Sequence, residues 1–357
     1  MDRRSFIQTA GNVAALSVLN VVFYLASAIT LAFLGYGLWS VLVGQLIAAL
    51  VSAVQFAWAA RLPLAPPRRL ALGEIGKTGW YGVATRLCEF AVTSVDTLAV
   101  ALTLGPAMTG IYSRAYNIGT QIKEPFMAVD STIRQALAKL RDEAGFRREI
   151  DRIIRLVVIA SALIVAGVFA AREEVVRVLL GEKFAAAAPI LIFILISLPA
   201  RTLMVAIEGA TVARGNMFNS LARMLLILAI LAPGVFIGAR YSAQGVAVAV
   251  AIATWIGALF ALKLFARDMQ RSYWSLFILL LPGIALGLVT ATLGALVEEG
   301  LDGFSPFFRL ISIMAFFGVA SFLIVVAMPA TWLPRVASEL RARLWKAVGI
   351  SGRGRAL

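Results

Sequence analysis

The sequence has no histidine and only one cysteine, Cys88, among its 357 residues. The missing histidines exclude a histidine-based catalytic triad and the usual zinc sites, and a single cysteine cannot form an internal disulfide. The chain also has no GxxxxGK[ST] stretch, so it does not bind ATP through a P-loop. We therefore expect a protein that is not an enzyme and that carries no cofactor or metal.

Charged residues are scarce as well. They make up 15% of the chain, against about 25% in soluble domains, while 61% is hydrophobic and the mean hydropathy is +0.89. A membrane-spanning helix needs about 20 mostly apolar residues. The sequence predicts an all-α, polytopic membrane protein of about ten transmembrane helices, over 11–34, 38–60, 78–104, 108–133, 156–171, 189–210, 218–239, 243–265, 273–297 and 307–328.

The basic residues fall on alternate connections between these spans. Lysine and arginine outnumber aspartate and glutamate by 33 to 19, which gives a formal net charge of +14. Basic clusters precede the first span, follow the second, and recur around 134–155, 214, 263–271 and 335–355, whereas the intervening connections are nearly neutral or acidic. The positive-inside bias then predicts that both termini are cytoplasmic. Attraction to anionic membrane lipids accounts for this charge without any nucleic-acid partner.

One predicted span carries charge where lipid would be expected. The stretch GVATRLCEFAVTSVDT (82–97) contains Arg86, Glu89 and Asp96. An intramembrane charge costs roughly 2.5–3.5 kcal/mol on insertion scales, so such groups face protein or water. Arg86 and Glu89 are three residues apart and can pair on a helix, and Asp96 lies two turns beyond Glu89 on the same side.

The next span has a second polar seam. Arg114, Asn117, Gln121 and Glu124 recur at helical spacing, and Lys123 and Arg134 add positive charge near the predicted cytoplasmic half. A thinner pattern follows, with Arg201 and Glu208 seven residues apart and Arg223 at the start of the next helix. Interhelical salt bridges that only hold the bundle together are one interpretation. We favour a hydrated cavity, because small residues and van der Waals contact are enough to pair membrane helices.

Three stretches resemble a known family. They are GYGLWSVLVGQL (35–46), VDTLAVALTLGPAMTGIYSRAYNI (95–118) and VVRVLLGEKFAAAAPIL (175–191). Together they resemble the polysaccharide flippases of the multidrug/oligosaccharidyl-lipid/polysaccharide exporter superfamily, especially the lipopolysaccharide branch. The resemblance implies a bundle of two lobes around a cavity. It assigns 1–66 to the remnant of an N-terminal lobe lacking the family's first four helices, 67–268 to a six-helix lobe, 269–330 to two accessory helices and 331–357 to a basic cytoplasmic tail.

The resemblance also implies a function. Such a protein flips a polyprenyl-pyrophosphate-linked oligosaccharide from the cytoplasmic to the outer leaflet of the bacterial inner membrane, with membrane lipids and glycan polymerases or glycosyltransferases as further partners. Cations would hold the pyrophosphate, amides would bind sugar hydroxyls, and carboxylates would balance charge or bind a coupling ion. In that order, the predicted substrate-binding residues are Arg86, Arg114, Lys123 and Arg134; Asn117 and Gln121; and Glu89, Asp96 and Glu124.

Three alternatives remain open on the sequence. A small-molecule exporter of the same superfamily would share the fold, but the mixed charge of the seams argues against cationic drugs. A glycan polymerase or ligase would need a catalytic domain or long outer loop, and the longest outer connection, 172–188, has no histidine. A non-transporting remnant is the third, and four further apolar spans encoded upstream would argue against it.

Overall fold

A computed structural model of the chain describes residues 19–37, 39–59, 69–138, 142–214, 217–300, 303–329 and 332. Within these ranges the regular secondary structure is entirely helical, with no strand. The chain divides into two compact units, Met1–Gly73 and Glu74–Leu357, and each is described by itself.

The first unit contains two apolar helices, Leu19–Phe33 and α2 (Trp39–Ala59). The turn between them includes Gly35 and Gly37 at φ 84° and 53°, a left-handed conformation that glycine adopts without steric cost. A Cβ added to Gly44 would lie 3.0 Å from the Cβ of Ala28, so the two helices approach closely. Small residues permit this approach, as they do in other membrane helix pairs.

The long element α3 (Arg69–Ala138) contains two of the predicted spans. It is broken at Gly105, whose φ of 83° and ψ of 176° are not helical. Pro106 follows at once, and a proline is well placed at the start of a helix because its missing N–H would have no intrahelical partner there. The connection predicted between the spans 78–104 and 108–133 is therefore a break of one residue within α3.

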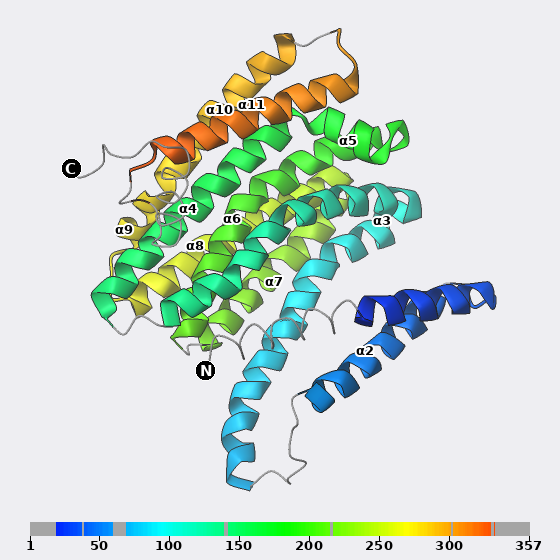
Figure 1. The fold of residues 1–357 in the computed structure, drawn as a ribbon, viewed down its shortest axis with the longest axis vertical. Coiled ribbons are helices and arrows are strands. Elements are labelled where there is room, and N and C mark those ends of the chain that lie inside the picture. Colours follow the sequence, from blue (N-terminus) through cyan, green and yellow to red (C-terminus); the bar gives the residue numbers. More distant parts are fainter. Residues whose placement is uncertain are drawn as a thin grey trace. The chain divides into compact units, whose positions relative to one another are not determined.

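The remaining helices follow in close succession. They are α4 (Glu143–Ala170), α5 (Arg172–Leu180), η1 (Glu182–Ala187), α6 (Ala188–Ala213), α7 (Met217–Ala239), α8 (Ala243–Asp268), α9 (Tyr273–Phe277), η2 (Ile278–Leu280), α10 (Leu281–Gly300) and α11 (Pro306–Ala327). Helix α4 packs between α6 and α10, α6 also packs on α8, and α8 packs on α7 (Figure 1). Helix α11 covers α4 and α5.

Seven helical segments of the described chain are long and apolar enough to cross a membrane. One of them, Gly82–Met127, combines two predicted spans, and the two apolar helices of the first unit are shorter in their described parts. Each of the ten predicted spans thus has a helical counterpart. The prediction of an all-α, polytopic membrane protein is confirmed.

Ion pairs link neighbouring helix connections at each of the two ends of the second unit. At one end, Arg214 contacts Glu143 at 3.1 Å and Arg271 contacts Asp151 at 2.6 Å, which joins two turns to the start of α4. At the other end, Arg309 at the start of α11 contacts Glu174 of α5 at 3.2 Å. Connections that alternate along the chain therefore lie at the same end of this unit. The cytoplasmic orientation and the domain boundaries stay predictions, and the predicted tail, 331–357, lies outside the described residues except for Trp332.

Candidate functional site

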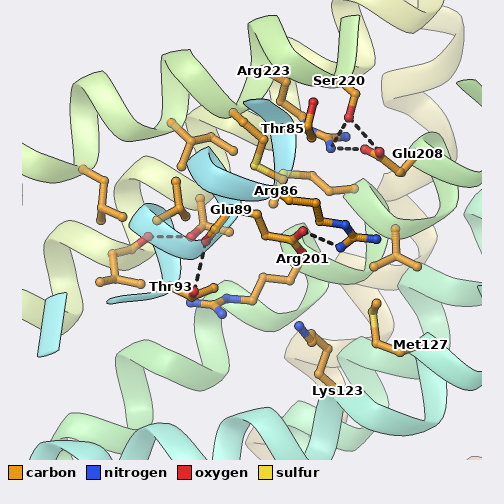
Figure 2. A pocket seen from close by; sticks show the side chains of 18 of the residues that line it. Thr85, Arg86, Glu89, Thr93, Lys123, Met127, Arg201, Glu208, Ser220 and Arg223 are labelled. Carbon is orange, nitrogen blue, oxygen red and sulfur yellow. Dashed lines mark hydrogen bonds and ion pairs between the residues drawn. The ribbon is translucent and has the colours of Figure 1, made fainter. Parts of the chain in front are cut away.

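A cavity of about 380 Å³ lies among α3, α6, α7 and α8 of the second unit (Figure 2). Much of its wall is apolar and includes Met127, Met204, Met224 and Ile227. Six charged side chains also line it: Arg86, Glu89 and Lys123 from α3, Arg201 and Glu208 from α6, and Arg223 from α7. Because all four helices contain apolar segments of membrane-spanning character, the cavity is a polar site within the membrane-embedded part of the protein.

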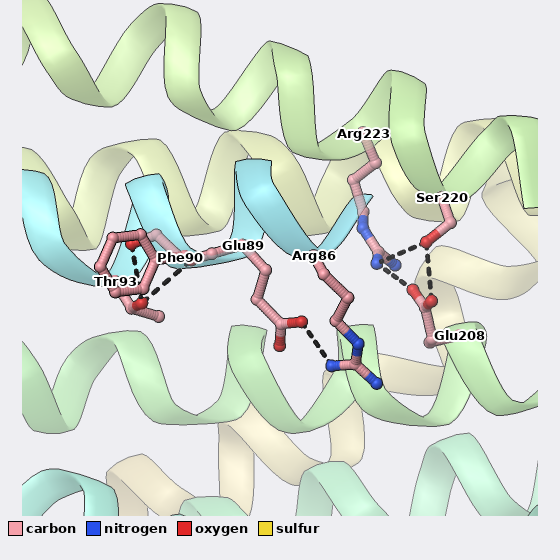
Figure 3. Close-up of polar contacts among 7 residues, drawn as sticks. All are labelled: Arg86, Glu89, Phe90, Thr93, Glu208, Ser220 and Arg223. Carbon is pink, nitrogen blue, oxygen red and sulfur yellow. Dashed lines mark hydrogen bonds and ion pairs between the residues drawn. The ribbon is translucent and has the colours of Figure 1, made fainter. Parts of the chain in front are cut away.

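Four of these charges form two ion pairs. The Arg86 guanidinium lies 2.6 Å from the carboxylate of Glu89 on the same helix, which confirms the predicted pair. This pair is accessible, since 81% of the Arg86 side chain is exposed. The second pair joins two helices: Arg223 of α7 donates to the carboxylate of Glu208 on α6 (Figure 3). Ser220 also donates to Glu208, at 2.7 Å. This second pair is well buried, since only 5% of the Arg223 side chain is exposed.

The other two cations, Lys123 and Arg201, form no direct ion pair with a carboxylate among the residues that the structure describes, although the charge of Asp96 acts on Arg201 from nearby. Arg201 donates to the Tyr116 hydroxyl at 3.1 Å and to the Ser197 hydroxyl at 3.2 Å. Its guanidinium carbon also lies 5.3 Å from the centre of the Tyr116 ring, within the range of a cation–π contact. Lys123 faces the same cavity from α3 (Figure 2).

The cavity therefore carries an excess of positive charge. Four cationic and two carboxylate side chains line it, so two positive charges are left without a counter-charge in the wall. An ion interacts more strongly with such charges in a poorly polarisable surrounding than in water. Arginine and lysine also give strong, charge-assisted hydrogen bonds to phosphate and carboxylate oxygens. The arrangement is suited to an anion.

Asp96 lies behind the cavity wall and has a different environment. It is 1% exposed and accepts a hydrogen bond from the Tyr112 hydroxyl at 2.9 Å, as well as one from the Thr97 amide at 2.6 Å. Asp96 and Tyr112 lie on opposite sides of the break at Gly105. Their hydrogen bond therefore holds the two halves of α3 together, which is a structural role that the sequence does not reveal.

Replacement of Tyr112 by phenylalanine removes this hydrogen bond and leaves the ring in place. We expect Tyr112→Phe to lower the free energy of unfolding by about 1–3 kcal/mol, the usual cost of leaving a buried polar group without its partner. Thermal unfolding in detergent measures the change. Tyr241→Phe is the matched control, because Tyr241 is 83% exposed, and an equal loss in both variants would contradict the assigned role.

The predicted residues of the second seam lie on another face of α3. Arg114, Asn117, Gln121 and Glu124 are exposed, and none of them lines the cavity. With 3.6 residues per turn, Tyr116, Lys123 and Met127 share the face towards the cavity, and these four positions are rotated away from it. The side chain of Arg134 lies outside what the structure describes. The contact of these five residues with substrate stays a prediction.

Of the nine predicted residues, the structure thus brings Arg86, Glu89 and Lys123 into one cavity. It adds Arg201, Glu208 and Arg223, which were noted in the sequence as a thinner seam and were not predicted as binding residues. The spacing of seven between Arg201 and Glu208 was the available signal, because it places both on one side of an apolar helix. What the sequence could not show is that α7 supplies the partner of Glu208.

The fold and the cavity together define a multi-pass helical membrane protein with a charged internal site. A family model described as "Polysaccharide biosynthesis protein" matches residues 8–189, which is half of the chain. The chain belongs to this family, and the matched region includes Arg86, Glu89 and Lys123. No curated protein and no solved structure matches the chain.

Proposed function

We propose that this protein moves a lipid-linked oligosaccharide across the membrane during polysaccharide synthesis, and that the cavity holds the diphosphate of that lipid. The excess of positive charge in the cavity is the observation that carries the proposal. The match to a polysaccharide biosynthesis family supports it, because the charged, hydrophilic head group of a lipid-linked sugar diphosphate does not cross a bilayer unaided.

The size of the cavity suits the head of such a substrate. Pockets for small ligands are about 300–1,000 Å³, and this one, at about 380 Å³, is at the small end. A diphosphate with an adjoining sugar fits that volume, whereas a long isoprenoid tail or a whole oligosaccharide does not. The tail accordingly stays in the bilayer, and the outer sugars extend beyond the cavity.

We assign each side chain a role in substrate binding from its ion pairing and its exposure. Lys123 and Arg201 are the principal ligands of the diphosphate, because both line the cavity and neither forms a direct ion pair with a carboxylate of the described structure. Arg86 is exposed enough to reach an arriving head group, with Glu89 as its counter-charge. The exposed residues Asn117 and Gln121 would bind sugar hydroxyls along α3, as the sequence predicts.

The remaining parts of the proposal follow from chemistry and charge. With no nucleotide-binding motif, an ion gradient or the membrane potential drives the transfer. By the positive-inside bias, the basic connections favour cytoplasmic termini for a protein of the bacterial inner membrane, and export then runs from the cytoplasmic to the outer leaflet. The protein is a transporter and not an enzyme, and the glycosyltransferases and polymerases of the same synthesis are its partners.

Reconstituted liposomes test this function. A fluorescent short-chain isoprenyl diphosphate sugar is placed in both leaflets, and a reagent that cannot enter the liposome destroys the fluorescence outside. We expect the protein to make nearly all of the probe accessible, against about half in empty liposomes. A cationic dye should not be moved, because the cavity is positively charged. Failure to move the diphosphate probe, together with transport of the dye, would overturn the proposal in favour of a drug exporter.

A further inference from the structure

The buried pair of Glu208 and Arg223 is unusual for a cavity that attracts anions. Arg223 is 4% exposed, and its Nε atom has no hydrogen-bond partner among the described residues. The terminal nitrogen of the same guanidinium donates to the carboxylate of Glu208, which Ser220 also contacts (Figure 3). Arg223 therefore lies in the wall of the cavity, and Glu208 satisfies only part of the hydrogen-bonding capacity of its guanidinium.

A carboxylate and a phosphate bind arginine in the same way. Both present two oxygens to the planar fork of N–H groups, often as two parallel hydrogen bonds. The oxygens of Glu208 thus stand where phosphate oxygens of a ligand would stand on Arg223. Glu208 comes from α6 and Arg223 from α7, so separating them requires only that one side chain rotate within a cavity that both of them line.

We propose that Glu208 is a built-in competitor of the substrate for Arg223, a role that rests on the proposed binding of a diphosphate in this cavity. The diphosphate first meets Lys123 and Arg201 and then takes Arg223 from Glu208, which keeps its hydrogen bond from Ser220. On release, the carboxylate returns to the guanidinium. Arg223 is paired in both states, so it never becomes a buried cation without a partner, which would be strongly unfavourable.

This competition lowers the affinity for the substrate and favours its release. A transporter gains from such a device, because a site that bound a diphosphate with three unopposed cations would hold it too tightly for rapid turnover. The same reasoning applies to ion channels, where binding must be favourable enough for entry and weak enough for exit. Glu208 is accordingly a residue that sets affinity, and it does not itself bind the anion.

Binding measurements on the purified, full-length protein test the role. The probes are inorganic pyrophosphate and farnesyl diphosphate, and the second shows whether the site takes the head group of a lipid. We expect Glu208→Gln to tighten the binding of both probes by about tenfold or more, since it removes the competing charge and keeps the shape and the contact with Ser220. Asp151→Asn is the matched control, because Asp151 pairs with Arg271 outside the cavity, and it should leave the affinity unchanged.

Repeating the Glu208→Gln substitution in a protein that lacks Arg223 separates competition for Arg223 from simple repulsion of the anion. In Arg223→Gln protein there is nothing to compete for, so adding Glu208→Gln should change the affinity by less than about threefold. The same tenfold tightening in both backgrounds would overturn the proposal. Glu208→Asp serves where the glutamine variant does not fold: a shorter carboxylate reaches Arg223 less well and should tighten binding, and this tightening should disappear in the Arg223→Gln background.

The outcomes also separate this inference from the proposed function. If the unaltered protein binds neither diphosphate, the proposed anion site is wrong. If it binds them and Glu208→Gln has the affinity of the unaltered protein, the anion site stands and the competitor does not exist. Binding of pyrophosphate without competition by farnesyl diphosphate would contradict a lipid head group as the occupant.

Discussion

Cells whose own copy of the protein is replaced by a Lys123→Gln/Arg201→Gln variant are expected to lose the export of surface polysaccharide. Both side chains line the cavity, and neither forms a direct ion pair with a carboxylate among the described residues. A hydrogen bond to a charged group contributes roughly 1.5–3 kcal/mol, so each replacement weakens the binding of a diphosphate by about ten- to a hundredfold. The double variant should therefore bind pyrophosphate too weakly to measure. Polysaccharide on the cell surface and binding to purified protein are the two readouts.

A matched pair of cations outside the cavity gives the control. Lys263 and Arg267 lie on α8, are exposed and do not line the cavity. Lys263→Gln/Arg267→Gln makes the same change in net charge, and we expect it to retain export. The amount of each variant in the membrane fraction must equal that of the unaltered protein. Normal export by the Lys123→Gln/Arg201→Gln variant at equal abundance would remove these residues from the substrate site.

The contrast between Arg86 and Arg114 shows how far sequence reasoning reaches into the site. Both are intramembrane arginines in polar seams, and both were predicted to bind the diphosphate. The structure places Arg86 in the cavity wall and Arg114 on an exposed face of the same element. Helical periodicity identifies which residues share a face, but it does not say which face meets α6 and α7. That choice depends on contacts between residues far apart in the chain.

The fold was more predictable than the site because its signals are local. Twenty-residue apolar runs give the spans, and the alternation of basic connections gives the sorting of their ends. The break in α3 follows from one glycine before one proline, at Gly105 and Pro106. The pairing of α4 with α10, and of α7 with α8, has no comparable local signal. Such contacts depend on small residues whose partners are set by the whole bundle.

A substitution at the contact between α7 and α8 should cause the second large effect, a loss of stability. A Cβ added to Gly238 would lie 2.4 Å from the carbonyl oxygen of Gly245, and one added to Gly245 would lie 2.6 Å from the carbonyl oxygen of Gly238. Both obstacles are backbone atoms, so no rotation of a side chain relieves them. We expect Gly238→Val to lower the free energy of unfolding by roughly 3 kcal/mol or more, at the upper end of the cost of overpacking.

Gly110→Val is the control that isolates this close approach. Gly110 is also within a helix, but an added Cβ would meet nothing within 4 Å. Replacing a helical glycine there removes a flexible residue, which by itself favours the helix by roughly 0.5–1 kcal/mol for alanine and by less for valine. Thermal unfolding of both variants in the same detergent should therefore give opposite or clearly unequal shifts. Equal shifts would show that α7 and α8 do not meet at these glycines, and the wall of the cavity that α7 provides, with Arg223 in it, would then need another arrangement.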